Sequence, residues 1–453
     1  MRRLFGTDGV RGVVGEMLTV ELATKIGRTL ATVLSGKGRY RPLVLVGMDT
    51  RISSEMLSAA LSAGACSMGA DVIDIGVLPT PAVAYLTKKY RADAGVAISA
   101  SHNSFEYNGI KIFSQDGFKL PDALEEEIER IVLGDEPLTS AIGDAVGRIR
   151  RSEHALSDYV EHVRRCAFND LSGLSVAIDC ADGAASETAE LLFSSLGAEC
   201  HMLACTPNGV NINDGCGSTH LEHLSAFVKE HRVDVGIAFD GDADRILCVD
   251  ENGCEVDGDR ILAILSLDRK RRGVLRNGTV VGTVMSNLGF TRFCEENGIR
   301  FVAAKVGDRY VLETMELEGD MIGGEQSGHI ILRDHATTGD GQLTAVELLS
   351  LMRREGKSLS ELASVMRHYP QCLVNIRTTP EGKIAFYTDR EIAVLLEETG
   401  RALEGRGRLV VRPSGTEPLL RVMVESETEE ETERVAHEVA EKIRERLSVL
   451  SAQ

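Results

Sequence analysis

Three aspartates with alternating spacing follow an apolar run. Asp240, Asp242 and Asp244, in DGDADR, come directly after VGIAF. In an extended segment such residues project to one side, so we expect their carboxylates to converge. Carboxylate oxygens suit Mg²⁺. Because clustered anions are unfavourable without a cation, the spacing predicts a magnesium site rather than a surface turn rich in Asp and Gly.

Ser101 lies in SASHN at the end of the apolar run VAIS, with His102 beside it and Lys111 ten residues further on. No GxSxG elbow surrounds this serine, which disfavours acyl hydrolysis. A serine near a Mg²⁺ loop suits a phosphoryl carrier, and Arg11 and Lys111 would neutralise the ~1.5 to 2 negative charges of a phosphoserine. On its own, Ser101 is also compatible with an ordinary loop serine.

RPSGTEP, which begins at Arg412, offers a guanidinium, two hydroxyls and backbone N–H groups at a glycine. These groups bind phosphate in proteins, although the segment is not a Walker A loop. Arg421 on the next predicted strand could face the same anion. The alternative is a plain hairpin loop with a surface arginine.

GGEQSGH places Glu325, Ser327 and His329 among three glycines. Alternating polar side chains at a strand end can bind adjacent sugar hydroxyls, and the glycines allow a substrate to lie close. His329 is also a candidate acid or base, although a lone loop histidine is more often a packing residue.

The segments between these motifs predict an α/β fold. Short β-branched runs at 43–49, 174–180 and 278–284 are each followed by a stretch with helical periodicity. This alternation is typical of parallel strands joined by crossover helices.

The motifs also repeat. Ser101 follows Asp93 by eight residues in one apolar run, Asp242 follows Asp234 by eight in another, and 318–329 is a weaker third copy. The repeat predicts three related α/β domains with mixed sheets, each contributing one polar loop to an active site in the central crevice, and the alternative is chance similarity of short strand motifs. After 368–371 the chain changes to a strand, a helix, two strands around RPSGTEP and a charged helix, which predicts a C-terminal α+β domain. The predicted domains are 1–155, 156–258, 259–369 and 370–453.

Composition excludes several classes of function. The chain has 453 residues, 50 Lys+Arg and 69 Asp+Glu, for a formal net charge of −19, which disfavours nucleic-acid binding. No apolar run approaches membrane-spanning length and the first residues lack a signal-peptide pattern, so we expect no membrane association and a cytoplasmic location. Ten cysteines without a CxxC pair favour buried reduced thiols. The acidic stretch 125–127 and the charged final segment are predicted to be solvated helix faces.

FGTDGVRG, SASHN, DGDADR, GGEQSGH and RPSGTEP, in this order, resemble the motifs of the α-D-phosphohexomutase superfamily, over the whole chain. NDGCGSTH at 213–220 and VGDRYV at 306–311 resemble its bacterial branch that acts on glucosamine phosphates. One departure is Ser104, where many relatives carry a proline that would stiffen the loop.

The resemblance implies roles for individual residues. Ser101 would be the phosphoserine, with Asp240, Asp242 and Asp244 holding one Mg²⁺ per subunit together with an oxygen of its phosphate. The other implied residues surround the phosphoserine (Arg11, His102, Lys111, Arg245), bind sugar hydroxyls (Glu325, Ser327), grip the non-reacting phosphate (Arg412, Ser414, Gly415, Thr416, Arg421), or act as acids and bases (Lys111, His329).

The implied reaction interconverts glucosamine 6-phosphate and glucosamine 1-phosphate through a sugar 1,6-bisphosphate, which is both intermediate and activator. The main alternative is a phosphomannomutase/phosphoglucomutase with the same mechanism. A phosphosugar sensor without turnover and a metal-dependent phosphatase are further alternatives. The resemblance also suggests a homodimer.

Overall fold

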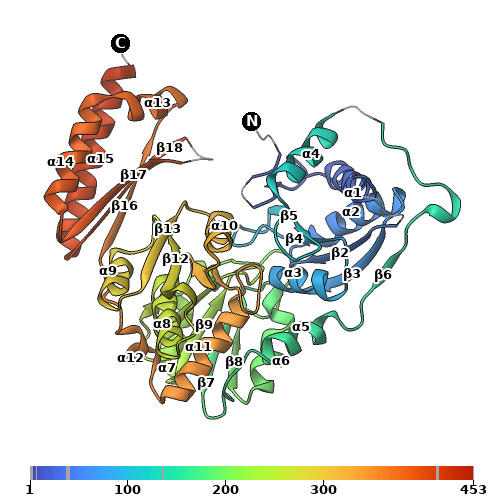
Figure 1. The fold of residues 1–453 in the computed structure, drawn as a ribbon, viewed down its shortest axis with the longest axis horizontal. Coiled ribbons are helices and arrows are strands. Elements are labelled where there is room, and N and C mark those ends of the chain that lie inside the picture. The colour runs from blue at the N-terminus through green and yellow to red at the C-terminus, as the bar shows by residue number, and fades with distance from the viewer. Residues whose placement is uncertain (1–3, 7, 37–40, 135–136, 415–417, 452–453) are drawn as a thin grey trace. The chain divides into compact units, whose positions relative to one another are not determined.

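The computed structural model describes residues 4–6, 8–36, 41–134, 137–414 and 418–451 (Figure 1). Residues 449–451 are described by their backbone alone. The chain forms two compact units. The first comprises residues 1–285 and 298–365, and the second comprises 286–297 and 366–453. The four predicted domain boundaries stay predictions.

The first unit contains three sheets. The six-stranded sheet has the order β1-β5-β4-β2-β3-β6, with α1, α2 and α4 packed on one face and α3 on the other (Figure 1). Its elements are β1 (Val10–Val13), α1 (Val20–Ser35), β2 (Leu43–Met48), α2 (Ser54–Ser67), β3 (Asp71–Val77), α3 (Thr80–Lys89), β4 (Ala94–Ile98), β5 (Tyr107–Ser114), α4 (Asp122–Leu133) and β6 (Ile149–Arg151).

The second and third sheets have the orders β11-β10-β9-β7-β8 and β13-β12-β14-β15. The elements from this part of the chain are α5 (Ala155–Arg164), β7 (Ser175–Asp179), α6 (Ala189–Ser195), β8 (Glu199–Leu203), α7 (Glu222–His231), β9 (Val235–Phe239), β10 (Ile246–Asp250), β11 (Glu255–Val256), α8 (Gly258–Arg271), β12 (Thr279–Thr283), β13 (Arg300–Ala304), α10 (Asp308–Glu318), β14 (Ile322–Gly324), β15 (Ile330–Leu332), α11 (Gly341–Glu355) and α12 (Leu359–Ala363).

All three sheets share one topology. With β1 of the six-stranded sheet left aside, the first strand of each sheet (β2, β7 or β12) lies between two parallel neighbours, and the third strand then pairs with an antiparallel fourth (β5, β10 or β15). The loops between the third and fourth strands are therefore equivalent, and they carry Ser101, the three aspartates and Glu325. This arrangement confirms the predicted three related α/β domains with mixed sheets.

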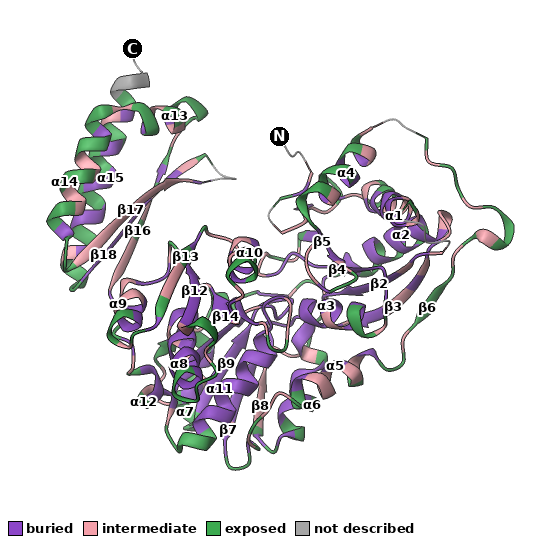
Figure 2. Ribbon diagram, viewed as in Figure 1, coloured by how far each residue is buried: buried purple, intermediate pink, exposed green. Residues whose placement is uncertain are grey.

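Burial explains why the central strands have continuous apolar sequences. Every residue of β4 (AGVAI) and β9 (VGIAF) is buried, as expected for strands covered on both faces, and Figure 2 shows this buried interior. Polar residues appear where these strands end, which places the motif loops at the sheet edges.

The second unit is of α+β type, as predicted. Its antiparallel sheet has the order β16-β18-β17, and α15 packs on β16 and β18. Its elements are α9 (Leu288–Glu296), β16 (Gln371–Arg377), α13 (Pro380–Thr388), α14 (Arg390–Leu403), β17 (Gly407–Pro413), β18 (Leu419–Ser426) and α15 (Glu429–Ser451). The helix α13 was not predicted. The helix α9 joins this unit through the Leu288 amide, which donates to Glu425 Oε2 (2.9 Å).

Two expectations about individual side chains were wrong. Glu125 is buried rather than solvated, because α4 turns it toward Arg309 Nη1 (3.0 Å), whereas Glu126 and Glu127 are exposed. The ten cysteines are free, but only five of them are buried, four are partly exposed, and Cys254 is exposed in the turn before β11.

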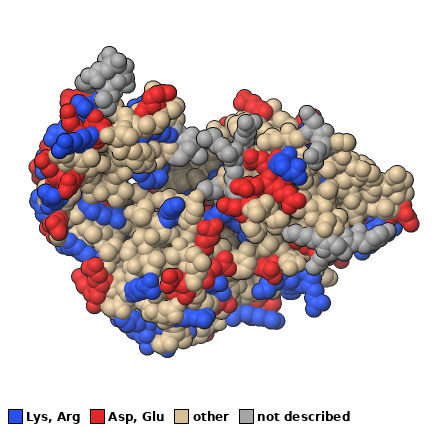
Figure 3. Space-filling model, turned by 45° about the horizontal axis from the view of Figure 1, so that its top comes forward, with Lys and Arg blue, Asp and Glu red and all other residues tan. Residues whose placement is uncertain are grey.

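The surface carries charged side chains of both signs, as expected for a chain with 50 Lys+Arg and 69 Asp+Glu. Acidic and basic side chains are interspersed over the face drawn in Figure 3. None of the helices that the structure describes is long and apolar enough to cross a membrane.

Candidate active site

The three predicted metal-binding aspartates lie together in the loop between β9 and β10. One carboxylate oxygen of each lies within 4.8 Å of the others, and all three residues are buried. The loop is a turn, in which Ala243 has a φ of 54°, so the expected extended segment was wrong. The chain reverses here to pair β10 antiparallel to β9, and the turn rather than an extended strand makes the carboxylates converge.

The backbone of this loop is held by three different parts of the chain. Its carbonyls accept hydrogen bonds from the amides of Thr80 (3.0 Å, to Asp242), Ala184 (2.8 Å, to Gly241) and Gly341 (3.0 Å, to Ala243). Gly241 is required by close approach, because a Cβ there would lie 2.6 Å from the carbonyl oxygen of Ser101. The position of the carboxylates is therefore fixed by all three related domains.

The electrostatics of the aspartates favour a cation. Burial, and then the charges of Asp244 and Asp242, raise the pKa of Asp240 to about 8. Lys111 Nζ lies 2.8 Å from Asp242 Oδ2 and 3.4 Å from Asp244 Oδ2, but the Oδ1 atoms of both aspartates are buried and have no hydrogen-bond partner among the described residues. Buried oxygens with unused lone pairs are unfavourable unless a ligand fills them. The residues present therefore fit a divalent cation with oxygen ligands.

Ser101 faces these aspartates from the equivalent loop between β4 and β5. Its hydroxyl donates to Asp240 Oδ2 at 2.5 Å, and the residue is 1% exposed. Its φ is 54°, a left-handed conformation that costs about 1–3 kcal/mol for a residue with a Cβ and often occurs at functional sites. The serine and the acidic loop, 139 residues apart in sequence, therefore form one site.

Two residues that the sequence analysis did not assign hold the Ser101 loop in place. Arg51, which is fully buried and paired with Asp49, donates to the carbonyls of Ser101 (2.8 Å), Asn103 (2.9 Å) and Ser104. Asn213 Nδ2 donates to the carbonyls of Ser101 (2.9 Å) and Asn103 (3.0 Å). This clamp fixes the backbone of the loop from Ser101 to Ser104.

Of the residues predicted to surround Ser101, His102 lies beside its hydroxyl and Lys111 contacts the aspartates. His102 Nδ1 lies 3.4 Å from the Ser101 hydroxyl, and burial, with the charges of Arg245 and Arg11, lowers the pKa of His102 to about 4. Burial alone would lower the pKa of Lys111, but the charges of Asp242, Asp8 and Asp244 raise it well above its ordinary value. Lys111 is thus held as a cation, and His102 is neutral.

A second charged cluster links two of the related domains. Lys119 Nζ lies 2.6 Å from Asp8 Oδ1 and also contacts Asp308, at the start of α10. Asp8 Oδ2 in turn lies 3.1 Å from Lys111 Nζ and contacts Arg11. We call these residues the Asp8–Lys119–Asp308 cluster. Asp8 and Asp308 lie inside quoted motifs, so the motifs located two of its members, but no sequence signal marks Lys119.

The GGEQSGH loop between β14 and β15 adjoins both clusters. Glu325 Oε1 accepts from the Gly307 amide (2.9 Å), and Ser327 is exposed. His329 is 2% exposed, with Nδ1 3.6 Å from Asp244 Oδ1. The Gly339 amide donates to His329 Nε2 (3.0 Å), which requires a lone pair there, so the ring proton lies on Nδ1, toward Asp244.

The predicted phosphate-binding residues lie in the second unit. Arg412 on β17 pairs directly with Arg421 on β18, and burial together with the charge of Arg421 lowers the pKa of Arg412. Ser414 is buried, and its carbonyl accepts from Lys383 Nζ (2.6 Å). Gly415 and Thr416 lie outside the described residues. Two facing guanidiniums repel each other and favour an anion between or beside them.

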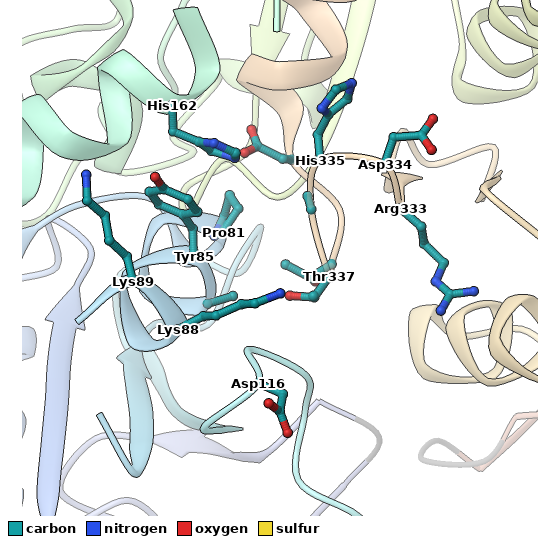
Figure 4. A pocket seen from close by; sticks show the side chains of 14 residues that line it. Pro81, Tyr85, Lys88, Lys89, Asp116, His162, Arg333, Asp334, His335 and Thr337 are labelled. Atoms are coloured by element: carbon teal, nitrogen blue, oxygen red, sulfur yellow. The ribbon is translucent and has the colours of Figure 1, made fainter. Parts of the chain in front are cut away.

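A separate cavity of about 440 Å³ contains none of the predicted site residues. It lies among α3, α5 and the loop at 333–340, where the rings of Tyr85 and His162 stack at 3.8 Å (Figure 4). The residues of the sequence motifs therefore lie outside this cavity.

Four family models match successive parts of the chain. They describe phosphoglucomutase/phosphomannomutase alpha/beta/alpha domain I (residues 2–138), domain II (157–253), domain III (257–369) and the C-terminal domain (373–442). The phosphoglucosamine mutases of Ruminiclostridium cellulolyticum and Caldanaerobacter subterraneus are 53% and 54% identical to this chain, over 94% of it and 95% of each relative.

Solved structures share the fold. A phosphoglucomutase/phosphomannomutase family protein from Burkholderia thailandensis has a TM-score of 0.82 at 22% identity, covering 99% of this chain and 98% of its own. The Aspergillus fumigatus N-acetylphosphoglucosamine mutase in complex with GlcNAc-6P and magnesium has a TM-score of 0.67 at 16% identity, covering 98% and 96%.

We predict that Arg51→Met lowers both stability and turnover. Removing the guanidinium takes the Arg51 donor from Asp49 Oδ2 and from the Ser104 carbonyl, and it leaves the Ser101 and Asn103 carbonyls with Asn213 alone. Loss of one partner of a buried ion pair costs about 3–5 kcal/mol. Thermal unfolding and steady-state rates check this, with Arg353→Met on the exposed face of α11 as the matched control. Normal turnover by a folded Arg51→Met variant would contradict the role of the clamp.

Proposed function

The chain belongs to the phosphoglucomutase/phosphomannomutase family, and from this premise we propose that it interconverts glucosamine 6-phosphate and glucosamine 1-phosphate. The phosphoglucosamine mutases that are 53–54% identical over nearly the whole chain support this substrate. Interconversion of glucose or mannose phosphates by the same mechanism is the second candidate, since the family models name those sugars. The proposed product feeds UDP-N-acetylglucosamine synthesis, which suits a cytoplasmic location.

The observation that carries the proposal is the 2.5 Å hydrogen bond from the Ser101 hydroxyl to Asp240. It places a nucleophilic oxygen against three buried carboxylates, in a loop held rigid by Arg51. A hydrolase would need an activated water and an open route for it, whereas a buried serine can keep a phosphoryl group away from water. The arrangement therefore favours transfer to and from Ser101 over release of inorganic phosphate.

Asp240, Asp242 and Asp244 would hold one Mg²⁺ per subunit together with an oxygen of the phosphate on Ser101. The ion would neutralise charge on the transferred phosphoryl group. Lys111 and Arg245 add positive charge from the protein itself. Arg245 Nε lies 3.8 Å from Asp244 Oδ1, and Lys111 contacts two of the carboxylates. These side chains bind and orient the phosphoryl group, with Arg11 and His102 beside it.

In the first half-reaction, O1 of glucosamine 6-phosphate attacks the phosphorus of phospho-Ser101. The bond from phosphorus to Oγ breaks, and the proton of the O1 hydroxyl passes to a base. In the second, the 1,6-bisphosphate has turned round, Ser101 Oγ attacks the 6-phosphoryl group, and O6 leaves and takes up a proton. Lys111 and His329 are the candidate groups for these two proton transfers.

Both orientations of the sugar must be bound. Glu325 and Ser327 are proposed to bind the 3- and 4-hydroxyls, which nearly exchange places when the sugar turns. Glu325 is anchored by the Gly307 amide, so its second oxygen can serve the substrate. The phosphate that is not reacting would be bound in the second unit by Arg412, Ser414, Gly415, Thr416 and Arg421. A homodimer is the proposed assembly.

The proposed function is tested by ³¹P NMR of the protein with Mg²⁺ and a trace of the matching sugar 1,6-bisphosphate. Glucosamine, glucose and mannose 6-phosphates are supplied separately. The proposal expects glucosamine 6-phosphate to become its 1-phosphate with much the highest kcat/KM. Preference for glucose or mannose 6-phosphate would support the second candidate, and release of inorganic phosphate would exclude a mutase.

We predict that Ser101→Ala abolishes turnover, because no other described hydroxyl contacts Asp240 in this way. The variant should still fold, since Ser101 contributes to the clamp through its carbonyl. Ser104→Ala in the same loop is the control and should keep most activity. A Ser101→Ala protein with near-normal rates would remove Ser101 as the phosphoryl carrier.

Removing the metal should stop the reaction. We predict that a chelator abolishes turnover, that added Mg²⁺ restores it, and that Mg²⁺ alone raises the melting temperature of the parent protein, because binding to the folded state stabilises it. Asp242→Asn should lose this shift, whereas Asp214→Asn at an exposed position should keep it. An equal shift in Asp242→Asn would place the ion elsewhere.

Arg412→Ala should chiefly raise KM. Loss of a charged hydrogen bond to phosphate corresponds to a KM increase of about 10- to 100-fold with a smaller change in kcat. Steady-state kinetics check this against Arg401→Ala on α14, where the side chain is 72% exposed. An unchanged KM would show that Arg412 does not bind the substrate's phosphate.

A further inference from the structure

Glucosamine differs from glucose by an amino group in place of the 2-hydroxyl, and at neutral pH much of this amine is an ammonium ion. A site that prefers glucosamine therefore needs a carboxylate near C2 of the sugar. This inference rests on the proposed function, because it concerns the carboxylate of the same site that binds the ammonium group. Outside the three aspartates, the candidates are Asp8, Asp308 and Glu325.

Asp8 is already neutralised by protein cations. Its Oδ1 lies 2.6 Å from Lys119 Nζ, while its Oδ2 lies 3.1 Å from Lys111 Nζ and contacts Arg11. Three cations on one carboxylate leave little negative potential for a fourth. Glu325 is the proposed ligand of the 3- and 4-hydroxyls, which glucose and glucosamine share, so it cannot by itself distinguish the two sugars.

Asp308 is less compensated. Its Oδ2 contacts a single ammonium, that of Lys119, and lies 3.8 Å from His329 Nε2, which carries a lone pair rather than a proton. Its Oδ1 accepts from the Arg309 amide (2.8 Å). The side chain is 15% exposed, so a substrate atom can reach it. Lys119 is shared between Asp8 and Asp308, so Asp308 has one shared ammonium where Asp8 has three cations.

Asp308 also lies between the two groups that would fix the sugar. The preceding residue, Gly307, donates to Glu325 (2.9 Å), and the His329 ring separates Asp308 from Asp244, with contacts of 3.8 Å and 3.6 Å at its two nitrogens. In a hexose, C2 is the carbon between C1, which reacts near the aspartates, and C3, whose hydroxyl Glu325 would bind. Asp308 therefore occupies the part of the site where the substituent of C2 must lie.

The carboxylate of Asp308 is held rigidly. Arg309, the next residue, lies with Nη1 3.0 Å from Glu125 and 2.8 Å from Asp122, and its Nη2 donates to the Leu120 carbonyl (2.6 Å). These contacts attach the first turn of α10 to α4. A fixed carboxylate loses little conformational entropy when it binds an ammonium, which favours discrimination between substrates.

We infer that Asp308 binds the 2-ammonium group of glucosamine phosphate when C1 faces Ser101, with Lys119 as the positioning residue that orients its carboxylate. The carboxylate of Asp308 thereby selects glucosamine phosphate over glucose phosphate at the same active site. When the sugar turns round, C2 moves away from Asp308, so the ion pair forms in one of the two orientations.

The test compares glucosamine 6-phosphate with glucose 6-phosphate in Asp308→Asn, with Mg²⁺ and the matching bisphosphate. The ratio of their kcat/KM values should fall by about 10- to 100-fold, because the amide keeps the shape of the side chain but loses its charge. Glucose 6-phosphate serves as the internal control for damage to the shared chemistry. Glu313→Gln, which removes one charge from an exposed position on the same helix, should keep the parent ratio.

A ratio that stays at the parent value in Asp308→Asn, or equal losses for the two sugars, would overturn the inference. Thermal unfolding of each variant identifies a folding defect, and Asp308→Ser provides the same comparison if the asparagine variant is unfolded. The parent protein separates this inference from the proposed function. A parent without preference for glucosamine 6-phosphate contradicts the function itself, whereas a selective parent with an equally selective variant contradicts only the role of Asp308.

Discussion

The burial of three carboxylates in one turn is the constraint on which the rest of the first unit depends. Burial, and then repulsion by Asp244 and Asp242, raises the pKa of Asp240 to about 8. Lys111, Arg245 and His329 each approach one or more of these groups. Each buried ion needs a partner of opposite sign. The buried negative charge of the aspartates therefore requires the cations beside them, and these cations in turn contact further carboxylates such as Asp8.

The loops that carry this chemistry could be predicted because each follows a fully buried strand. The runs before Ser101 and Asp240 are apolar without interruption, so the polar residues after them mark the strand ends. The shared topology of the three sheets then brings equivalent loops together. The turn geometry at 240–245 could not be predicted in this way, since Ala243 adopts a left-handed conformation for which alanine has no preference.

The contacts that hold the site could not be predicted, for a different reason. Lys119 meets Asp308 across 189 residues, and Arg309 meets Glu125 across 184. Nothing in the local sequence distinguishes these side chains from surface charges, and Glu125 was wrongly expected to be solvated because it stands in an acidic helix. Partners of this kind depend on how domains pack, which periodicity and motif spacing do not encode.

The hydrogen bonds on the carbonyls of the acidic loop also bear on the order of events during synthesis. Amides of Thr80, Ala184 and Gly341 hold three consecutive carbonyls, and the last of these donors stands about a hundred residues after the loop itself. A nascent chain that has emerged only as far as β10 lacks the Gly341 amide and the ring of His329. The catalytic loop is therefore completed late in translation, after three-quarters of the polypeptide has been made, so that a truncated chain ending before α11 cannot assemble it.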